Sequence, residues 1–114
     1  MDPMDLLPPA LRDLSRSATQ AVLPYEESLA AIEIFERSRY AVCHWEPCDE
    51  PRAEGEIQRR SGEPWADYVH RCAESVRRAL HASAMASGRS EAHGGGSTWY
   101  RLAVRVPTGS AGIR

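Results

Sequence analysis

Residues 64–87 read PWADYVHRCAESVRRALHASAMAS, and the periodicity of this stretch decides the fold. Its large apolar side chains recur every three or four positions, which places them on one face of a helix. They are Trp65, Val69, Cys72, Val76 and Leu80. Ser61 and Pro64 are typical of a helix start and Gly88 of a helix stop. We therefore predict one long amphipathic helix over residues 64–87.

Residues 98–106 (TWYRLAVRV) alternate between two kinds of side chain, as in a strand with one buried face. The apolar face carries Tyr100, Leu102, Val104 and Val106, and the other face carries Trp99, Arg101, Ala103 and Arg105. Since the helix and the strand each have one apolar face, we expect these faces to pack together. The remaining core residues are expected to be Leu29, Ile32 and Phe35.

The first third of the chain predicts two helices and a strand. Apolar residues follow helical spacing over residues 11–22, after two prolines, and again over residues 25–35. Residues 39–46 (RYAVCHWE) are rich in strand-forming side chains and predict a strand. Its alternation places Tyr40, Val42 and His44 on one face and Ala41, Cys43 and Trp45 on the other. Whether residues 56–60 form a returning strand stays open.

This order predicts an α+β fold with two N-terminal helices, a small two- or three-stranded sheet, and one long amphipathic helix packed on one face. We expect one domain over residues 8–106, with a flexible leader at 1–7 and a flexible tail at 107–114. Residues 88–97 contain three consecutive glycines and are expected to form a flexible loop. Because a two-stranded sheet is marginal by itself, residues 56–60 or a second copy of the chain would complete it.

The composition is that of a single globular domain. The chain has 114 residues, of which 42% are hydrophobic and 26% charged, and its formal net charge is −2. A general nucleic-acid or anionic-membrane binder carries a basic excess, so this balance disfavours both classes. No apolar stretch approaches the roughly 20 residues of a membrane span, and the acidic N-terminus does not resemble a secretory signal. We therefore expect a cytoplasmic protein.

The 14 strongly basic residues are all arginine, and the chain contains neither lysine nor asparagine. Both missing residues have AT-rich codons, so we interpret the bias as the codon usage of a GC-rich bacterial, phage or mobile-element source. Whatever its origin, the bias makes every strong cation a planar, multidentate donor.

All three cysteines and two of the four histidines lie within residues 43–72. Thiolates and imidazoles are the usual zinc ligands, so the alternative hypothesis of a structural zinc site would use Cys43, Cys48, His44 and His70. His70 and Cys72 point about 200° apart on a helix, and no second C-x-x-C pair is present. We favour three reduced, structural cysteines and predict no metal or other cofactor.

No catalytic arrangement emerges from the sequence. Cys43 and His44 are adjacent on a strand and point to opposite faces, so they do not form a nucleophile–base pair. The glycines at 94–96 are not followed by Lys-Ser/Thr and do not form a phosphate loop. We therefore predict a protein that is not an enzyme.

Arginine and tryptophan, which are enriched at interface hot spots, mark a candidate interaction surface. The residues are Trp99, Arg101 and Arg105 on the last strand, with Arg71, Arg77 and Arg78 on the long helix. Our leading hypothesis is a small protein that binds another protein, as an accessory, inhibitor or adaptor. The alternatives are a nucleic-acid-associated regulator that uses the same Arg/Trp strand face, and the small zinc protein.

Overall fold

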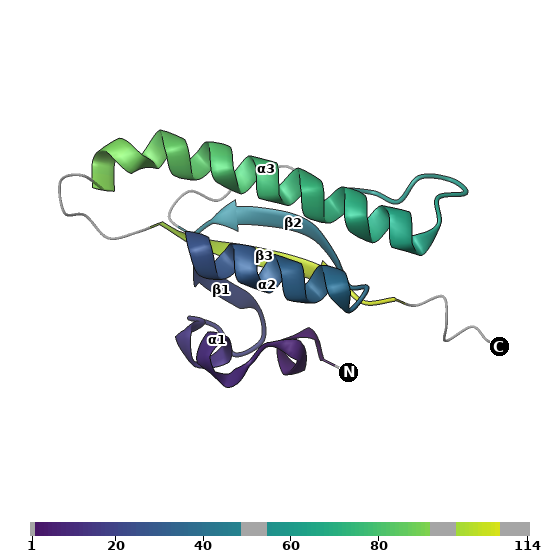
Figure 1. Ribbon diagram of the computed structural model, residues 1–114, viewed down its shortest axis with the longest axis horizontal. Helices are drawn as coiled ribbons and strands as arrows, with labels where there is room; N and C mark the ends of the chain where they lie inside the picture. The colour runs from purple at the N-terminus through teal and green to yellow at the C-terminus, as the bar shows by residue number, and fades with distance from the viewer. Residues whose placement is uncertain (1, 49–54, 92–97, 108–114) are drawn as a thin grey trace.

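The computed structural model describes residues 2–48, 55–91 and 98–107 (Figure 1). In chain order its elements are η1 (Pro3–Leu6), α1 (Pro9–Leu14), β1 (Ala21–Pro24), α2 (Tyr25–Arg37), β2 (Ala41–Pro47), α3 (Trp65–Glu91) and β3 (Trp99–Arg105). The strands form one antiparallel sheet in the order β1–β3–β2. The predicted α+β fold with one long helix is therefore confirmed.

The central strand of the sheet is β3, which comes last in the chain. On one side Leu102 lies opposite Ala21 of β1, and on the other side it lies opposite Trp45 of β2. Strands β1 and β2 do not pair with each other, so both depend on β3 for the hydrogen bonds of the sheet.

A β-bulge at Cys43 corrects the predicted faces of β2. Val42 lies opposite Val104, but the next paired residue is His44, opposite Ala103. One extra residue shifts the alternation, so Trp45 shares a face with Val42 rather than with Cys43. The Trp45 ring packs on Tyr100 with centroids 5.9 Å apart. The expectation that Val42 and His44 share a face is therefore wrong.

The first predicted helix is shorter than expected, and an irregular turn and a strand follow it. Helix α1 ends at Leu14, and residues 21–24 form β1. Between them the Ser15 hydroxyl donates to the carbonyls of Ser17 and Gln20 and accepts from the amide of Val22 at 3.0 Å. Serine side chains compete in this way with the backbone bonds of a helix, and here they turn the chain toward the sheet.

The third strand is thus β1, and residues 56–60 are not a strand. One backbone bond still joins that segment to β2, because the Ile57 amide donates to the Cys43 carbonyl at 2.7 Å. The sheet has its third strand within the chain. Sheet completion therefore gives no reason to expect a second copy.

Two expected boundaries are also wrong. Of the predicted leader, residues 2–7 belong to the domain, because Pro3–Leu6 form η1, and Met4 and Leu7 are 6% and 1% exposed in the core. Helix α3 continues past Gly88 to Glu91, since a single glycine inside a helix costs only about 1 kcal/mol. The remainder of the predicted glycine-rich loop, 92–97, and residues 108–114 of the tail lie outside the described residues.

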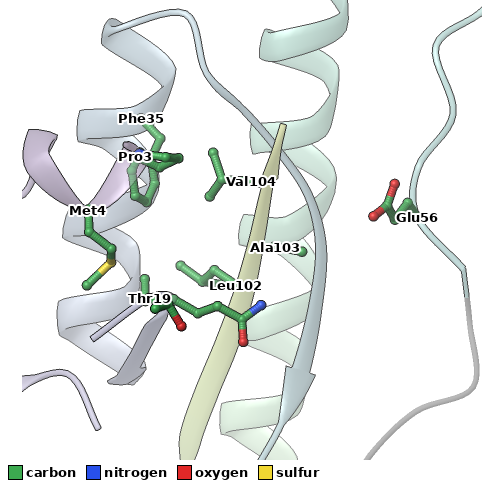
Figure 2. Close-up of a pocket in the computed structure, with 10 residues that line it drawn as sticks. Pro3, Met4, Thr19, Phe35, Glu56, Leu102, Ala103 and Val104 are labelled. Atoms are coloured by element: carbon green, nitrogen blue, oxygen red, sulfur yellow. The ribbon is translucent and has the colours of Figure 1, made fainter. Parts of the chain in front are cut away.

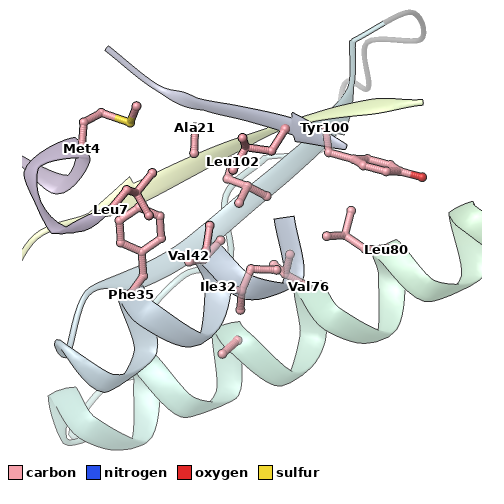
Figure 3. Close-up of a cluster of buried hydrophobic side chains, with 13 residues drawn as sticks. Met4, Leu7, Ala21, Ile32, Phe35, Val42, Val76, Leu80, Tyr100 and Leu102 are labelled. Atoms are coloured by element: carbon pink, nitrogen blue, oxygen red, sulfur yellow. The ribbon is translucent and has the colours of Figure 1, made fainter. Parts of the chain in front are cut away.

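The main hydrophobic core lies between the sheet and α2, with the second half of α3 closing it (Figure 3). Ile32 and Phe35 of α2 and Val76 and Leu80 of α3 are buried there with Leu102. This part of the predicted packing is confirmed. The Tyr100 hydroxyl also hydrogen-bonds the Ser83 hydroxyl at 3.2 Å, so β3 and α3 are joined directly.

The first half of α3 belongs to a second cluster, which differs from the prediction. Val69 and Cys72 are buried with Ala41 and Cys43 of β2, and Trp65 packs on their edge. Helix α3 therefore lies mainly on β2 and α2, and it meets β3 near its two ends, through Tyr68 beside Arg105 and through Ser83 beside Tyr100. None of the described helices combines the length and apolar character needed to cross a bilayer.

Helix α2 ends in a Schellman motif. Arg39 has φ 65°, the amide of Arg39 donates to the Glu36 carbonyl, and the amide of Tyr40 donates to the Phe35 carbonyl at 2.8 Å. The Arg39 carbonyl accepts a 2.7 Å bond from the Trp65 indole N–H. This turn therefore fixes the end of α2 and the start of α3 together, although a non-glycine residue is strained at positive φ.

We predict that Leu102→Ala lowers the free energy of unfolding by about 2–5 kcal/mol, because it leaves a cavity at the centre of the core. Leu80→Ala is expected to fall in the same range. The matched control is Arg101→Ala, one residue away on the other face, with an expected cost below about 1 kcal/mol. Urea denaturation measures all three, and an Arg101 variant less stable than the Leu102 variant would contradict the assigned faces.

Arg39→Gly is predicted to raise the free energy of unfolding by about 1 kcal/mol, because glycine adopts φ 65° without the clash of a Cβ atom. Arg39→Ala keeps the Cβ atom and serves as the control that separates loss of the guanidinium from relief of strain. Thermal and urea unfolding of the three proteins test this. Equal stabilities of the glycine and alanine variants would show that the turn is not strained.

Candidate interaction surface

The sheet has a second face, which points away from α2, and α3 reaches it only at the Arg105 end, where Ala41 is buried against Tyr68. We call this face the open face; beside the buried Val22, its residues are His44, Glu46, Trp99, Arg101, Ala103 and Arg105. The alternation of β3 puts Trp99, Arg101 and Arg105 there, as the sequence predicted. The three strand residues of the proposed surface therefore lie in one row.

Each cation of this row has a partner on the same face. Arg101 donates to the Glu46 carboxylate at 2.9 Å, and His44 lies 3.8 Å from the other oxygen of that carboxylate. Arg16, from the segment before β1, places its guanidinium 4.0 Å from the centre of the Trp99 ring. The open face thus carries a row of paired charges with one aromatic ring at its end.

Arg105 lies at the end of the row nearest α3. It donates to Glu56 at 2.6 Å, and its guanidinium lies 5.9 Å from the ring centre of the buried Tyr68. The Tyr68 hydroxyl donates to the Ile57 carbonyl at 2.6 Å. Loss of hydration raises the pKa of Tyr68 to about 12, so this hydroxyl stays protonated and remains a donor.

Arg71 holds the irregular segment before α3. It donates twice to Glu63, at 2.8 Å each, and once to the Gln58 carbonyl at 2.7 Å. The bonds from the Arg71 side chain and the Arg60 amide lower the pKa of Glu63 to about 2. The predicted interaction residue Arg71 is therefore engaged inside the molecule, where it fixes residues 58–63.

Arg77 has a similar internal role between the two main helices. It donates to Glu36 of α2 at 2.6 Å and to Glu74 of α3 at 3.4 Å. His70 lies 2.8 Å from the second oxygen of Glu36. Of the three helix arginines predicted at the interface, Arg78 is the one whose side chain lies exposed without a role in these networks.

The proposed surface is thus divided between two regions. Trp99, Arg101 and Arg105 share the open face, whereas Arg77 bridges α3 to α2. Sequence reasoning missed the carboxylates that pair with these cations, because Glu46 and Glu56 come from segments brought to β3 only by the fold. It also missed Tyr68, although this residue adjoins the apolar stripe one position before Val69.

Two of the three cysteines are buried side by side, and Cys48 is half-buried. Cys43 and Cys72 are buried in one cluster, and loss of hydration raises the pKa of both thiols, that of Cys43 to about 11. Such thiols are poor nucleophiles and poor metal ligands near neutral pH.

The four residues of the zinc alternative do not converge. His44 lies beside Glu46 on the open face, whereas His70 pairs with Glu36 of α2. Over residues 2–48, 55–91 and 98–107, no group of three or more His, Cys, Asp or Glu residues is arranged to hold a metal ion. The zinc hypothesis therefore gains no geometric support.

The chain matches no protein-family model, and it is similar to no curated protein and to no solved structure in the three comparisons. Function is therefore argued from the surface chemistry alone.

The Glu36–His70 contact generates a prediction about pH. Its hydrogen bond raises the pKa of His70, although loss of hydration opposes this; Glu74 raises the pKa further and Arg77 lowers it. Burial raises the pKa of Glu36, but the bonds from His70 and Arg77 outweigh burial and lower it. The contact is therefore fully stabilising between the two unfolded-state values, about 4.5 and about 6.5, and weakens on either side.

A double-mutant cycle of His70→Ala and Glu36→Gln measures this coupling. Since the folded pKa of His70 is raised, the histidine contribution is present at about pH 5.5 and lost at about pH 8.5. Urea unfolding of the four proteins at both values provides the coupling free energy. A coupling that is the same at both values would show that His70 does not become charged in this contact.

Proposed function

We propose that the protein acts without catalysis, by binding another protein, and that the partner docks on the open face around Trp99, Arg101 and Arg105. The observation that carries the proposal is the pairing of the two strand arginines, Arg101 with Glu46 and Arg105 with Glu56. A surface of paired cations and anions with a tryptophan at one end combines the residue types that are enriched at protein interfaces, arginine and tryptophan. The partner would be an adaptor target, an inhibited protein or a larger complex.

The same pairing favours a protein partner over nucleic acid. A site for phosphates presents unneutralised cations, whose binding releases counterions. Here Glu46 lies 2.9 Å from Arg101 and would face an approaching phosphate at close range. The formal net charge of −2 also disfavours binding to nucleic acid. A nucleic-acid-associated regulator that uses Trp99, Arg101 and Arg105 is therefore the second candidate.

The pairs also orient the side chains for recognition. The Arg101 side chain is 44% exposed while Glu46 is 17% exposed, so the carboxylate anchors a guanidinium whose outer edge still reaches solvent. Exposed ion pairs stabilise a fold by only about 0–1 kcal/mol. Their larger effect is to hold the guanidinium in one place, which reduces the entropy lost when a partner binds it.

Charge reversal on the open face tests the proposal. Purified wild type, Arg101→Glu and the matched control Arg78→Glu on α3 are used as bait in extracts of the native host. We expect the same partner to be retained by wild type and by the Arg78 variant, and its affinity for the Arg101 variant to fall at least about tenfold. A partner retained equally by all three would place the interface elsewhere.

Two further measurements address the alternatives. Trp fluorescence is titrated with short DNA and RNA oligomers at low salt, and binding that weakens steeply with salt and with Arg101→Glu would favour the nucleic-acid candidate. Metal analysis of untagged protein tests the zinc alternative, for which one equivalent of zinc per chain is the required result.

A further inference from the structure

The two ladders of β3 differ in length. The ladder with β1 ends where Ala21 lies opposite Leu102, whereas β3 continues to Arg105 and pairs with β2 as far as Ala41. On the β1 side, the last part of β3, residues 103–105, therefore has no neighbouring strand among the described residues. Residues 19 and 20, which would extend β1, turn away with their amides bonded to the Ser17 hydroxyl at 3.2 Å each.

The alternation of an antiparallel ladder fixes which backbone groups face this gap. The Val22 amide bonds Ser15 and its carbonyl bonds the Arg16 amide, both on the side away from β3. Ala21 therefore exchanges its hydrogen bonds with Leu102 across the ladder. Since the direction alternates along β3, Val104 is the next residue that turns its N–H and C=O toward the β1 side.

A cavity of about 370 Å³ lies at this position (Figure 2). Leu102 and Val104 form part of its wall, and Met4 and Phe35 lie on the core side of Val104. Glu56 lines the cavity on the opposite side of β3. An unpaired strand edge is a template for another strand, and here a cavity adjoins it, with Thr19, Gln20 and Glu56 as the polar part of its wall.

We propose that this edge binds an extended, uncharged peptide segment of the protein partner, which continues the line of β1 and pairs with Val104 through its main chain. Cross-strand neighbours share a face of the sheet, so the side chain of the peptide residue opposite Val104 lies beside the half-buried Val104 side chain. That residue is therefore apolar. The inference rests on the proposed function and specifies how part of the partner is recognised.

The charge and shape of the site determine this occupant. The carboxylate in the cavity wall, Glu56, is neutralised by Arg105 at 2.6 Å, so the site offers no unpaired charge to a charged peptide. The open edge spans residues 103–105, about 10 Å of strand, and Pro3 and Thr19 also line the cavity. A single extended segment of about three residues matches this length.

A proline scan first tests the backbone geometry without any ligand. Because the Val104 N–H points into the cavity, Val104→Pro is expected to remain folded, with a native circular-dichroism spectrum and a cooperative urea transition. Ala103→Pro removes an amide that faces β2 and is expected to unfold the protein or to lose most of its stability. Equal damage by both substitutions would overturn the assigned edge.

Peptide binding is then measured by NMR with the uncharged peptide acetyl-TVVVT-amide and with acetyl-TVPVT-amide, whose central residue lacks an N–H. We expect saturable shifts of the Val104 amide with the first peptide only. Affinity should fall about tenfold in Val104→Pro, which loses one main-chain hydrogen bond, and to a similar extent in Thr19→Trp, which fills the cavity. Arg78→Ala, an exposed position on α3, is the control with unchanged affinity.

The alternative outcomes are distinct. Equal binding of both peptides, or no saturable shift at Val104 up to millimolar peptide, overturns the inference. Shifts confined to Trp99 and Arg101 overturn it but leave the open-face proposal standing. Shifts at Val104 that depend on protein concentration without peptide would show a second copy at this edge. If the peptide binds at Val104 but Arg101→Glu does not change binding of the natural partner, the peptide site stands and the open-face proposal is wrong.

Discussion

The sheet depends on a strand that the chain supplies last. Because β3 lies between β1 and β2, neither of these strands has a strand neighbour until residues 99–105 are in place. Both ladders join segments far apart in the sequence, so the entropy of closing those loops is lost before any sheet bond forms. The apolar face of β3, centred on Leu102, must therefore be buried in the same cooperative step that forms the sheet.

Side chains fix the irregular segments around this sheet. The Ser15 hydroxyl replaces a strand partner at the outer edge of β1, and the bond from Ile57 partly covers the outer edge of β2. Tyr68 and Arg71 bond the carbonyls of residues 57 and 58, and through them α3 positions the segment that supplies Glu56. The geometry of the proposed surface is consequently linked to the packing of the long helix.

The arginines show how the same residue type takes different roles. Arg71 and Arg77 satisfy carboxylates that join segments of the fold, whereas Arg101 and Arg105 pair with glutamates on the face of the sheet that points away from α2. In each case the position of the nearest glutamate determines how much of the guanidinium remains available for a partner. A phosphate-binding surface needs cations in excess, and this distribution does not provide it on the open face.

The sequence by itself determined the elements whose periodicity is strong: the long helix, the second helix, the strand of residues 99–105 and the face of that strand that carries Trp99, Arg101 and Arg105. A repeated apolar pattern fixes both the type of element and its buried face, because its period matches a helix or a strand and its apolar residues share one side. The tertiary structure alone decided that residues 21–24 form a strand, that a bulge at Cys43 moves Trp45 to the core face, and that glutamates pair with the arginines. These features depend on neighbours distant in sequence. A run of four apolar residues fits a helix or a strand equally well, and it becomes a strand here because the edge of β3 requires a hydrogen-bonding partner.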